Sequence, residues 1–314
     1  MSFGINVPAT TDVDPVALAR QAESLGYDFV SAADHPCGAS PTRETWTMLT
    51  WIAANTSRIR VATRVLGVPY RPPAMVAKMA ETLDRLSGGR LILGLGGGYS
   101  DEEFRAFGLT VPTPRDKVDG LDEAITIMHG LWSKQAFSFG GRLYQTDSAD
   151  LEPKPEHHIP IWLGTFGDRA LRVTGRRADG WIPSAGYVPD DELLVMHRKV
   201  LTAAAEAGRD PAEITCALNL GVAADHTAAQ VAGRVARFLA AGFTAINFMP
   251  SGPSLPDQVH RIAAELIPVL GSQFRMQRLF GAEWLAAPGG AFPAAARHRR
   301  FAALSGAACG HRRA

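Results

Sequence analysis

The stretch RIRVATRVLGVPYRPPAMVAKMAETLDRLSGGRLILGLGGGYS, residues 58–100, contains one complete strand–helix–strand unit. The runs 58–67 and 90–96 are apolar on both faces, which is typical of strands buried between layers of helices. Between them, apolar residues recur at helical spacing from Pro73 to about Leu86. Two such strands pair in parallel through a right-handed crossover. The stretch therefore predicts a parallel α/β architecture.

The same alternation extends in both directions along the chain. The first helix is the best marked, because Asp14 and Pro15 form a helix start and Gly26 a stop. Strands are expected at 3–7, 27–33, 58–67, 90–96, 159–165, 180–184, 213–223 and 243–249, and helices at 14–26, 44–55, 73–86, 115–132, 168–177, 190–207, 227–241 and 255–270. Eight units of this kind predict a closed (β/α)₈ barrel, a TIM barrel. A doubly wound open sheet is the alternative, since it uses the same alternation.

One segment interrupts the alternation and another follows it. Residues 108–158 contain a helix and a hairpin-like run, FSFGGRLYQ, and we interpret them as an insertion after the fourth strand. Past Arg275 no helix–strand unit is recognisable. The predicted domains are a barrel over 1–275 and a flexible tail over 276–314.

Charge and cysteine usage exclude several classes of function. The 314 residues include 32 basic and 31 acidic side chains, so no strong field draws the protein to nucleic acid or to an anionic membrane. No uncharged stretch is long enough and free enough of proline to cross a membrane as one helix. The three cysteines, Cys37, Cys216 and Cys309, form no CxxC pair, and the first residues lack a secretory pattern. We therefore expect a cytoplasmic protein whose partner is a small molecule.

Functional residues of a parallel barrel come from the carboxyl ends of its strands. His35 ends the second strand and could act as a base, a proton donor or a structural residue. The glycine run 94–98 fails the GxGxxG pattern because the sixth position is Tyr99. It either lets a flat ligand approach bare backbone or makes a tight turn. These strand ends supply the candidates Asp34, His35, Arg64, Gly96, Gly97, Gly98, Tyr99, Gly164, Thr165, Phe166, Gly167 and Asp168.

The glycine pair in LGTFGDRAL, residues 163–171, precedes a helix. Free amides at a helix start favour a phosphate, although Asp168 could instead cap its own helix. None of the five lysines lies at a strand end, which disfavours a Schiff-base aldolase. The first strand ends without an HxH motif and carboxylates are scarce at the strand ends, so we predict no metal site.

Three segments together resemble a known family. They are AADH (32–35), the long run from Arg64 to Gly108, and IPIWLGTFGDRALRVTGRRADGWIPS (159–184). The combination is similar to the luciferase-like monooxygenase family, the bacterial luciferase superfamily, over residues from about 3 to 270. The resemblance implies a (β/α)₈ barrel with a flavin or a deazaflavin at its mouth.

The resemblance also implies roles for particular residues. A non-prolyl cis peptide is expected near Arg64 and Val65, in a bulge that supports the cofactor ring. His35 would face the substrate side of the ring. Gly97, Gly98 and Tyr99 would line the ring and its side chain, and Gly164, Thr165, Gly167 and Asp168 would receive the phosphate. Tyr99 stands where related glucose-6-phosphate dehydrogenases have a proton-donating glutamate, so a sugar phosphate is not expected. Tyr99 itself could relay a proton or pack against the ring.

The branch that this chain resembles most depends on coenzyme F420, a 5-deazaflavin. The implied activity is hydride transfer between F420 and a small organic substrate, with His35 as proton relay. One alternative is an FMN-dependent two-component monooxygenase that uses oxygen and a separate reductase. Another is a barrel that binds a flavin or deazaflavin without turnover. Family resemblance also implies a homodimer.

Overall fold

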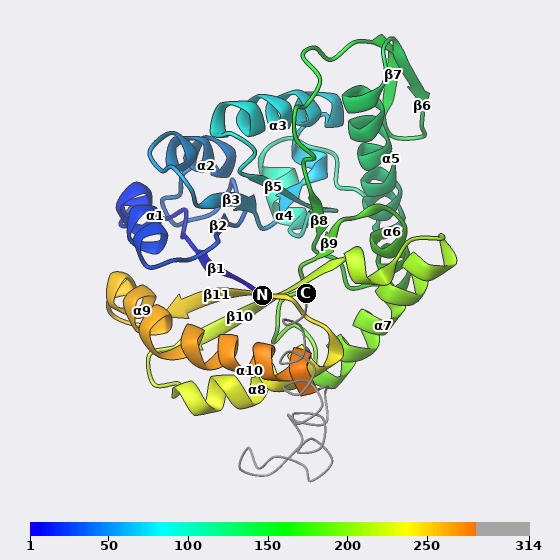
Figure 1. Ribbon diagram of the computed structural model, residues 1–314. Coiled ribbons are helices and arrows are strands. Elements are labelled where there is room, and N and C mark those ends of the chain that lie inside the picture. Colours follow the sequence, from blue (N-terminus) through cyan, green and yellow to red (C-terminus); the bar gives the residue numbers. More distant parts are fainter. Residues whose placement is uncertain (281–314) are drawn as a thin grey trace, which may run out of the picture.

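The computed structural model describes residues 1–280, and its strands form a closed parallel barrel (Figure 1). The eight strands are β1 (Ser2–Asn6), β2 (Phe29–Ala32), β3 (Arg60–Thr63), β5 (Leu91–Gly96), β8 (Ile161–Leu163), β9 (Gly180–Trp181), β10 (Thr215–Ala223) and β11 (Ala245–Ser251). Their order is β3-β2-β1-β11-β10-β9-β8-β5, and pairing of β3 with β5 closes the ring. The predicted (β/α)₈ barrel is confirmed and the open sheet is excluded.

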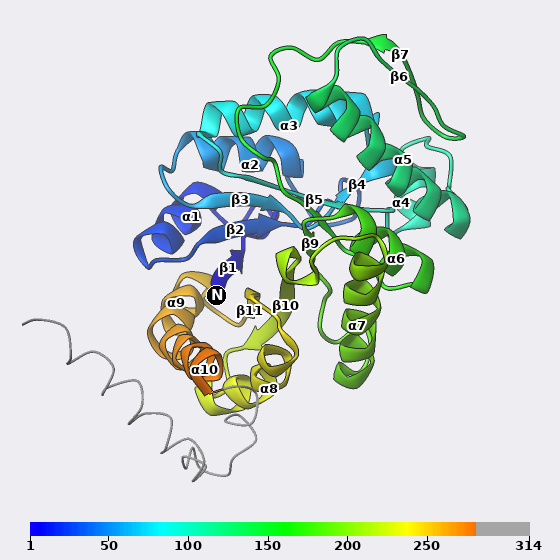
Figure 2. The same ribbon diagram turned by 45° about the vertical axis from the view of Figure 1, so that its right-hand side comes forward.

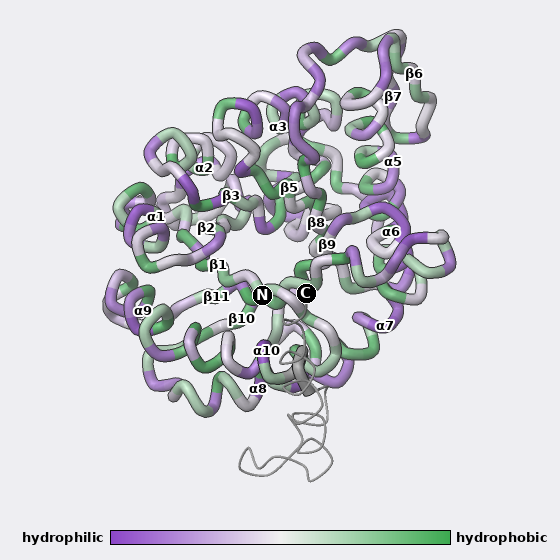
Figure 3. The backbone as a smooth tube through the Cα atoms, viewed as in Figure 1, coloured by the Kyte–Doolittle hydropathy of each residue, from purple (hydrophilic) through white to green (hydrophobic). Residues whose placement is uncertain are grey.

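Helices surround the barrel in chain order (Figures 1 and 2). They are α1 (Pro15–Ser24), α2 (Thr45–Ala54), α3 (Pro73–Ser87), α5 (Pro114–Ser133), α6 (Asp168–Arg177), α7 (Asp190–Glu206) and α8 (Ala228–Ala241), followed by α9 (Leu255–Arg261), a π-helical segment (Ile262–Leu266) and α10 (Ile267–Phe280). Short 3₁₀ turns lie at Val68–Tyr70 and Pro211–Glu213. Hydrophobic and hydrophilic residues alternate along these helices (Figure 3), as expected when one face packs on a sheet.

Only part of the segment 108–158 is an insertion into the barrel fold. Helix α5 packs against α3 and α6 and so takes the fourth place in the helix ring. The hairpin of β6 (Phe137–Gly140) and β7 (Gln145–Ala149) extends beyond that ring (Figure 2). A short helix, α4 (Asp101–Ala106), directly follows β5. At the other end of the chain, α10 continues past Arg275 to Phe280, and the rest of the predicted tail lies outside the described residues.

Apolar side chains fill the amino-terminal half of the barrel interior. Phe29 and Trp162 meet there edge to face, with ring centroids 5.6 Å apart. Ile92, Ile182 and Ala217 belong to the same buried cluster. This packing leaves the carboxyl ends of the strands as the place where the barrel can hold a ligand.

Two further observations concern the described residues as a whole. None of their helices combines the length and the hydropathy that a membrane crossing requires. No group of three or more His, Cys, Asp and Glu side chains within 1–280 has the arrangement of a metal site.

Candidate active site

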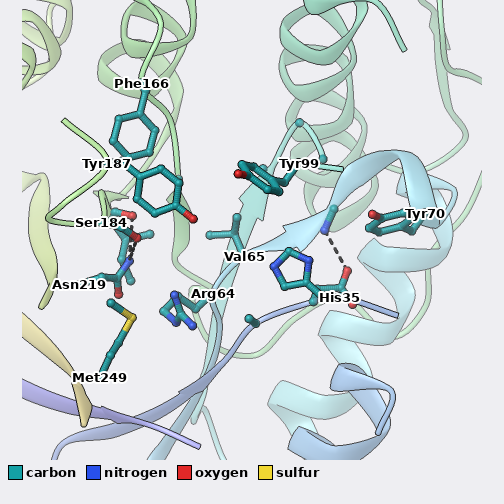
Figure 4. Close-up of a pocket in the computed structure, with 18 residues that line it drawn as sticks. His35, Arg64, Val65, Tyr70, Tyr99, Phe166, Ser184, Tyr187, Asn219 and Met249 are labelled. Carbon is teal, nitrogen blue, oxygen red and sulfur yellow. Dashed lines mark hydrogen bonds between the residues drawn. The ribbon is translucent and has the colours of Figure 1, made fainter. Parts of the chain in front are cut away.

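A cavity of about 510 Å³ opens at the carboxyl ends of the strands (Figure 4). It brings together candidates from strands that are distant in sequence: Asp34, His35, Arg64, Val65, Gly96, Gly97, Gly98, Tyr99, Gly164 and Phe166. Its lining also includes Tyr70, Ser184, Tyr187, Asn219 and Met249, which were not among the predicted site residues. Its volume is typical of a site for a small molecule or cofactor.

A bulge in the third strand forms one wall of this cavity. The peptide bond between Arg64 and Val65 is cis, at the position predicted from the sequence. After the bulge the chain continues as β4 (Leu66–Gly67), which pairs with β5 at Leu95 and Gly96. The side chain of Val65 therefore enters the barrel mouth between neighbouring strands.

The glycines around Val65 are required by the bulge. A Cβ on Gly94 would lie 1.9 Å from the Thr63 carbonyl oxygen, and a Cβ on Gly96 would lie 2.6 Å from Cγ2 of Val65. A Cβ on Gly164 would lie 3.1 Å from both Val65 methyl groups. The distances at Gly94 and Gly96 leave no room for a side chain, whereas a Cβ on Gly164 would require Val65 to shift by a few tenths of an ångström. The missing side chains thus make space for protein atoms, and the ligand-contact explanation offered above for this glycine run does not account for Gly94 or Gly96.

Gly97 and Gly98 are constrained in a similar way by the helices that follow. A Cβ on Gly97 would lie 2.9 Å from Cβ of Lys117 in α5. Gly98 has a φ of +85°, and its Cβ would lie 2.4 Å from the Phe104 ring in α4. Both residues still expose backbone to the cavity. The turn holds α4 close against the barrel mouth.

Helix α4 supplies a carboxylate that binds His35. Oε1 of Glu103 lies 2.9 Å from Nδ1 of His35, and Oε2 accepts a hydrogen bond of 2.5 Å from the Tyr70 hydroxyl. The Glu103 side chain is 12% exposed and that of His35 is 52% exposed. Burial, and then the hydrogen bond to Glu103, raise the pKa of Tyr70 well above its usual value, so its hydroxyl keeps its proton. Glu103 therefore acts as acceptor to both neighbours.

This arrangement fixes the chemistry that His35 can perform. An ionised carboxylate only accepts hydrogen bonds, so the neutral imidazole carries its hydrogen on Nδ1. Nε2 forms no hydrogen bond with the described residues, and His35 lines the cavity. A free imidazole nitrogen beside a ligand cavity can accept a proton from the ligand or return one.

Asp34, which precedes His35, connects two segments of the chain by hydrogen bonds. Its carboxylate accepts hydrogen bonds from both terminal nitrogens of Arg71, at 2.8 and 3.1 Å, and from the Gly67 amide at 3.0 Å. Burial lowers the pKa of Arg71, but the hydrogen bonds to Asp34 and Glu44 outweigh burial and leave this pKa raised. Asp34 therefore fixes the segment after the bulge to the end of β2.

Arg64 differs from Arg71 in having no carboxylate partner within residues 1–280. Its Nη2 donates a hydrogen bond of 3.1 Å to Oδ1 of Asn6, and its Nε is buried without an acceptor among the described residues. Burial lowers the pKa of Arg64, an effect that the neighbouring Tyr187 partly opposes. A guanidinium nevertheless stays charged at neutral pH. The cavity thus contains an unneutralised cation.

A chain of hydrogen-bonded amide and hydroxyl groups links Ser184 and Asn219 to Asn247 and to Ser31 of β2. Asn219 donates to Oγ of Ser184 at 3.2 Å, and its own Oδ1 accepts from Asn247 at 2.8 Å. Asn247 in turn accepts from Ser31 at 2.9 Å. These buried polar groups satisfy one another, which fixes their orientation. The side chains of Ser184 and Asn219 contribute neutral donors and acceptors to the cavity.

Three aromatic rings surround the entrance. Phe166 and Tyr187 lie on one side and Tyr99 projects over the cavity from the side of His35 (Figure 4). The ring centroids of Tyr99 and Tyr187 are 6.4 Å apart, and those of Tyr99 and His35 are 6.3 Å apart. Tyr99 is 73% exposed and Tyr187 is 64% exposed. Exposed rings at a cavity entrance provide stacking surfaces for a planar ligand.

The remaining candidates lie at the start of α6, outside the cavity lining. The Thr165 hydroxyl contacts the Thr174 hydroxyl at 2.7 Å, inside the protein. Gly167 is the N-cap of α6, no side chain caps this helix, and the space around Gly167 is open. Asp168 forms an ion pair of 2.6 Å with Lys199 of α7, and its hydrogen bond to this lysine lowers the pKa of the Asp168 carboxyl. The backbone amides of the first turn, rather than the Asp168 side chain, are available to an anion.

Comparisons with known proteins agree with this geometry. A family model described as luciferase-like monooxygenase matches residues 7–268. An F420-dependent glucose-6-phosphate dehydrogenase from Nakamurella multipartita is 32% identical over 262 residues, 79% of this chain and 74% of the relative. The enzyme of the same name from Kineococcus radiotolerans is 34% identical over 223 residues, and the match spans 68% of this chain but only 64% of that relative's length.

Among solved structures, an F420-dependent secondary alcohol dehydrogenase in complex with an F420-acetone adduct superimposes with a TM-score of 0.78. The match covers 86% of this chain and 98% of that one at 19% sequence identity. At this level of identity the superposition establishes a shared fold.

Proposed function

Because the chain belongs to the luciferase-like monooxygenase family, we propose that it is an oxidoreductase that transfers a hydride between coenzyme F420 and a small organic substrate. The observation that carries the proposal is the cavity in which His35, paired with Glu103, faces the Arg64–Val65 bulge. The F420-dependent relatives described above support the choice of cofactor.

The residues present fit a flat, phosphorylated cofactor. Val65 and the backbone of Gly97 and Gly98 offer a wall without protruding side chains, and Tyr99 and Phe166 offer rings at the entrance. The first turn of α6 follows Phe166 directly and has no capping side chain, so its amides would hold a phosphate. Gly164 and Gly167 belong to the segment before α6 that would contact the cofactor. Thr165 would contribute through its position in the turn.

When bound, F420 accepts or donates a hydride at C5 of its deazaflavin ring. The chain itself supplies proton transfer and orientation. During oxidation of an alcohol, Nε2 of His35 would take the hydroxyl proton, and Glu103 would stabilise the resulting imidazolium through Nδ1. In the opposite direction the imidazolium would return that proton to a carbonyl oxygen. Tyr70 holds Glu103 in place through its hydroxyl.

The proposal extends to the setting in which the enzyme works. We place it in the cytoplasm as a homodimer that acts on a small molecule. Cys37 and Cys216 are both free thiols, as a reducing compartment favours. In the direction of carbonyl reduction, which consumes reduced F420, a separate reductase would regenerate the reduced cofactor.

Binding and turnover with two cofactors test the proposal. Purified protein is titrated with F420 and with FMN, and turnover with a panel of alcohols and ketones is followed by F420 absorbance together with oxygen consumption. We expect tight F420 binding and turnover without oxygen uptake. Turnover that requires FMN and consumes oxygen would instead establish the monooxygenase.

A histidine variant separates catalysis from binding. His35→Gln should reduce turnover by about 100-fold or more while F420 affinity is retained. His260→Gln is the matched control, because His260 lies exposed on α9 and does not line the cavity. Retained F420 affinity with no reaction of the wild type on any substrate of the panel would favour the binding-only barrel.

A further inference from the structure

The guanidinium of Arg64 is the one Lys or Arg head group that lines the cavity within the described residues. The side chain points into the cavity, with His35 on one side and Asn219 and Met249 on the other (Figure 4). The two carboxylates nearby are already engaged, since Asp34 binds Arg71 and Glu103 binds His35. The positive charge of Arg64 is therefore available to a ligand.

Hydrogen bonding leads to the same conclusion. Of the guanidinium nitrogens, Nη2 donates to Asn6, whereas neither Nη1 nor Nε donates a hydrogen bond within residues 1–280. Burying a charged group without an ion-pair partner is unfavourable. An anionic ligand that enters the cavity would supply the missing partner. Asn6 orients the guanidinium but, as a neutral amide, does not neutralise it.

The number of charges limits the class of ligand. A single guanidinium matches a singly charged carboxylate in charge and in planar geometry. A phosphate ester carries nearly two negative charges, and no second lysine or arginine lines the described cavity to balance it. The side chains of Ser184 and Asn219 can bind further oxygen atoms of the ligand by neutral hydrogen bonds.

We propose that Arg64 binds a carboxylate of the substrate, so that the substrate is a small organic acid whose alcohol or carbonyl carbon lies toward His35. This inference rests on the proposed function, because it names the substrate class of the same cavity. The backbone of Arg64 remains part of the bulge beneath the cofactor, and its side chain is a specificity-determining group for the substrate.

Binding of matched acids and esters tests the inference. Lactate and mandelate, together with their methyl esters, are titrated by calorimetry into the wild type, Arg64→Gln and Arg64→Lys, each saturated with F420. We expect at least one acid to bind the wild type more tightly than its ester. Arg64→Gln should weaken binding of this acid by about 10- to 100-fold and leave binding of the ester unchanged. Arg64→Lys should restore part of the affinity for the acid.

Arg60→Gln is the matched control. Arg60 is the first residue of β3, whereas Arg64 directly follows the last. Like Arg64, it has a buried Nε without an acceptor among the described residues, but it does not line the cavity. Its replacement should not change acid binding. If Arg60→Gln weakened acid binding as much as Arg64→Gln, removal of either buried arginine would disturb this part of the barrel. That result would overturn the inference.

The remaining outcomes are distinguishable. Esters that bind as well as acids, acids that bind Arg64→Gln as well as the wild type, or no binding of any acid would each refute the carboxylate assignment. A loss of F420 affinity in Arg64→Gln with unchanged acid binding would make Arg64 a cofactor ligand and refute it too. Acid binding that depends on Arg64 in a protein that binds no F420 would uphold the anion site while the proposed function fails.

Discussion

Nδ1 of His35 lies 2.9 Å from Oε1 of Glu103, although 68 positions separate the two residues in the chain. The pairing joins the end of β2 to a helix that follows β5. It leaves Nε2 of His35 as the nitrogen that faces the ligand. Proton transfer at Nε2 depends on this contact.

Glu103→Gln should lower kcat by about 10- to 100-fold, because an amide cannot neutralise the imidazolium that forms during proton transfer. KM and F420 affinity should stay close to those of the wild type. Glu102→Gln is the control, since Glu102 is an exposed neighbour on the same helix. The variants are compared by steady-state kinetics. An equal loss of kcat in both would indicate that the negative charge of α4, and not the contact between Glu103 and His35, is what turnover requires.

Gly96→Ala should destabilise the protein by roughly 1–3 kcal/mol, because the added methyl would overlap Val65. Val65→Ala removes Cγ2, the methyl group that causes the overlap, so Gly96→Ala should be much less destabilising in that background. Urea unfolding of the single and double variants measures the coupling. Additive effects would show that Gly96 is required for another reason.

His197 should make the protein sensitive to acid. It is 2% exposed on α7, it packs against Trp181 and Phe243, and burial lowers its pKa to about 4. Between its unfolded pKa of about 6.5 and pH 4 the unfolded chain therefore binds a proton that the folded protein does not, and stability falls as pH falls. The loss between pH 7 and 5 should be about 2 kcal/mol.

His197→Leu should remove this part of the acid dependence. Free energies of unfolding at pH 7 and pH 5 are compared for the two proteins, with His197→Asn as a second variant in case the leucine is not accommodated. Identical pH dependence in wild type and variants would contradict the assignment.

The two free cysteines of the described part should differ in reactivity. Burial raises the pKa of Cys216 to about 12, whereas Cys37 is partly exposed in the loop after His35. A thiolate is the reactive form, so an alkylating reagent should label Cys37 and spare Cys216 in the native protein. Peptide mass spectrometry reads each site separately. Rapid labelling of Cys216 before unfolding would show that β10 opens locally.

The barrel was predictable because its strands are short runs that are apolar on both faces and its helices carry apolar residues at helical spacing. The glycine run 94–98 was expected to admit a flat ligand or to form a tight turn, and Gly98 does have the positive φ of a turn. Sequence alone does not reveal that the Thr63 carbonyl fills the space beside Gly94 and that Val65 fills the space beside Gly96. The cis peptide at Arg64–Val65 was expected from family resemblance, without a local signal of its own.

The partners of the site residues were not predictable in the same way. Glu103 follows Ser100, whose hydroxyl accepts the Glu103 amide hydrogen at the start of α4, and this pattern suggests only a helix cap. Its contact with His35 depends on how α4 folds back over the barrel mouth. Tyr187 lies in a loop before α7, where spacing carries no information about the cavity.

A crystal structure of the protein with F420 would show where the cofactor binds. We expect the deazaflavin ring in the 510 Å³ cavity, in contact with Val65 and within reach of His35, and a phosphate at the first-turn amides of α6. A cofactor bound elsewhere on the protein, or a cavity that stays free of F420 at saturating concentration, would contradict this expectation.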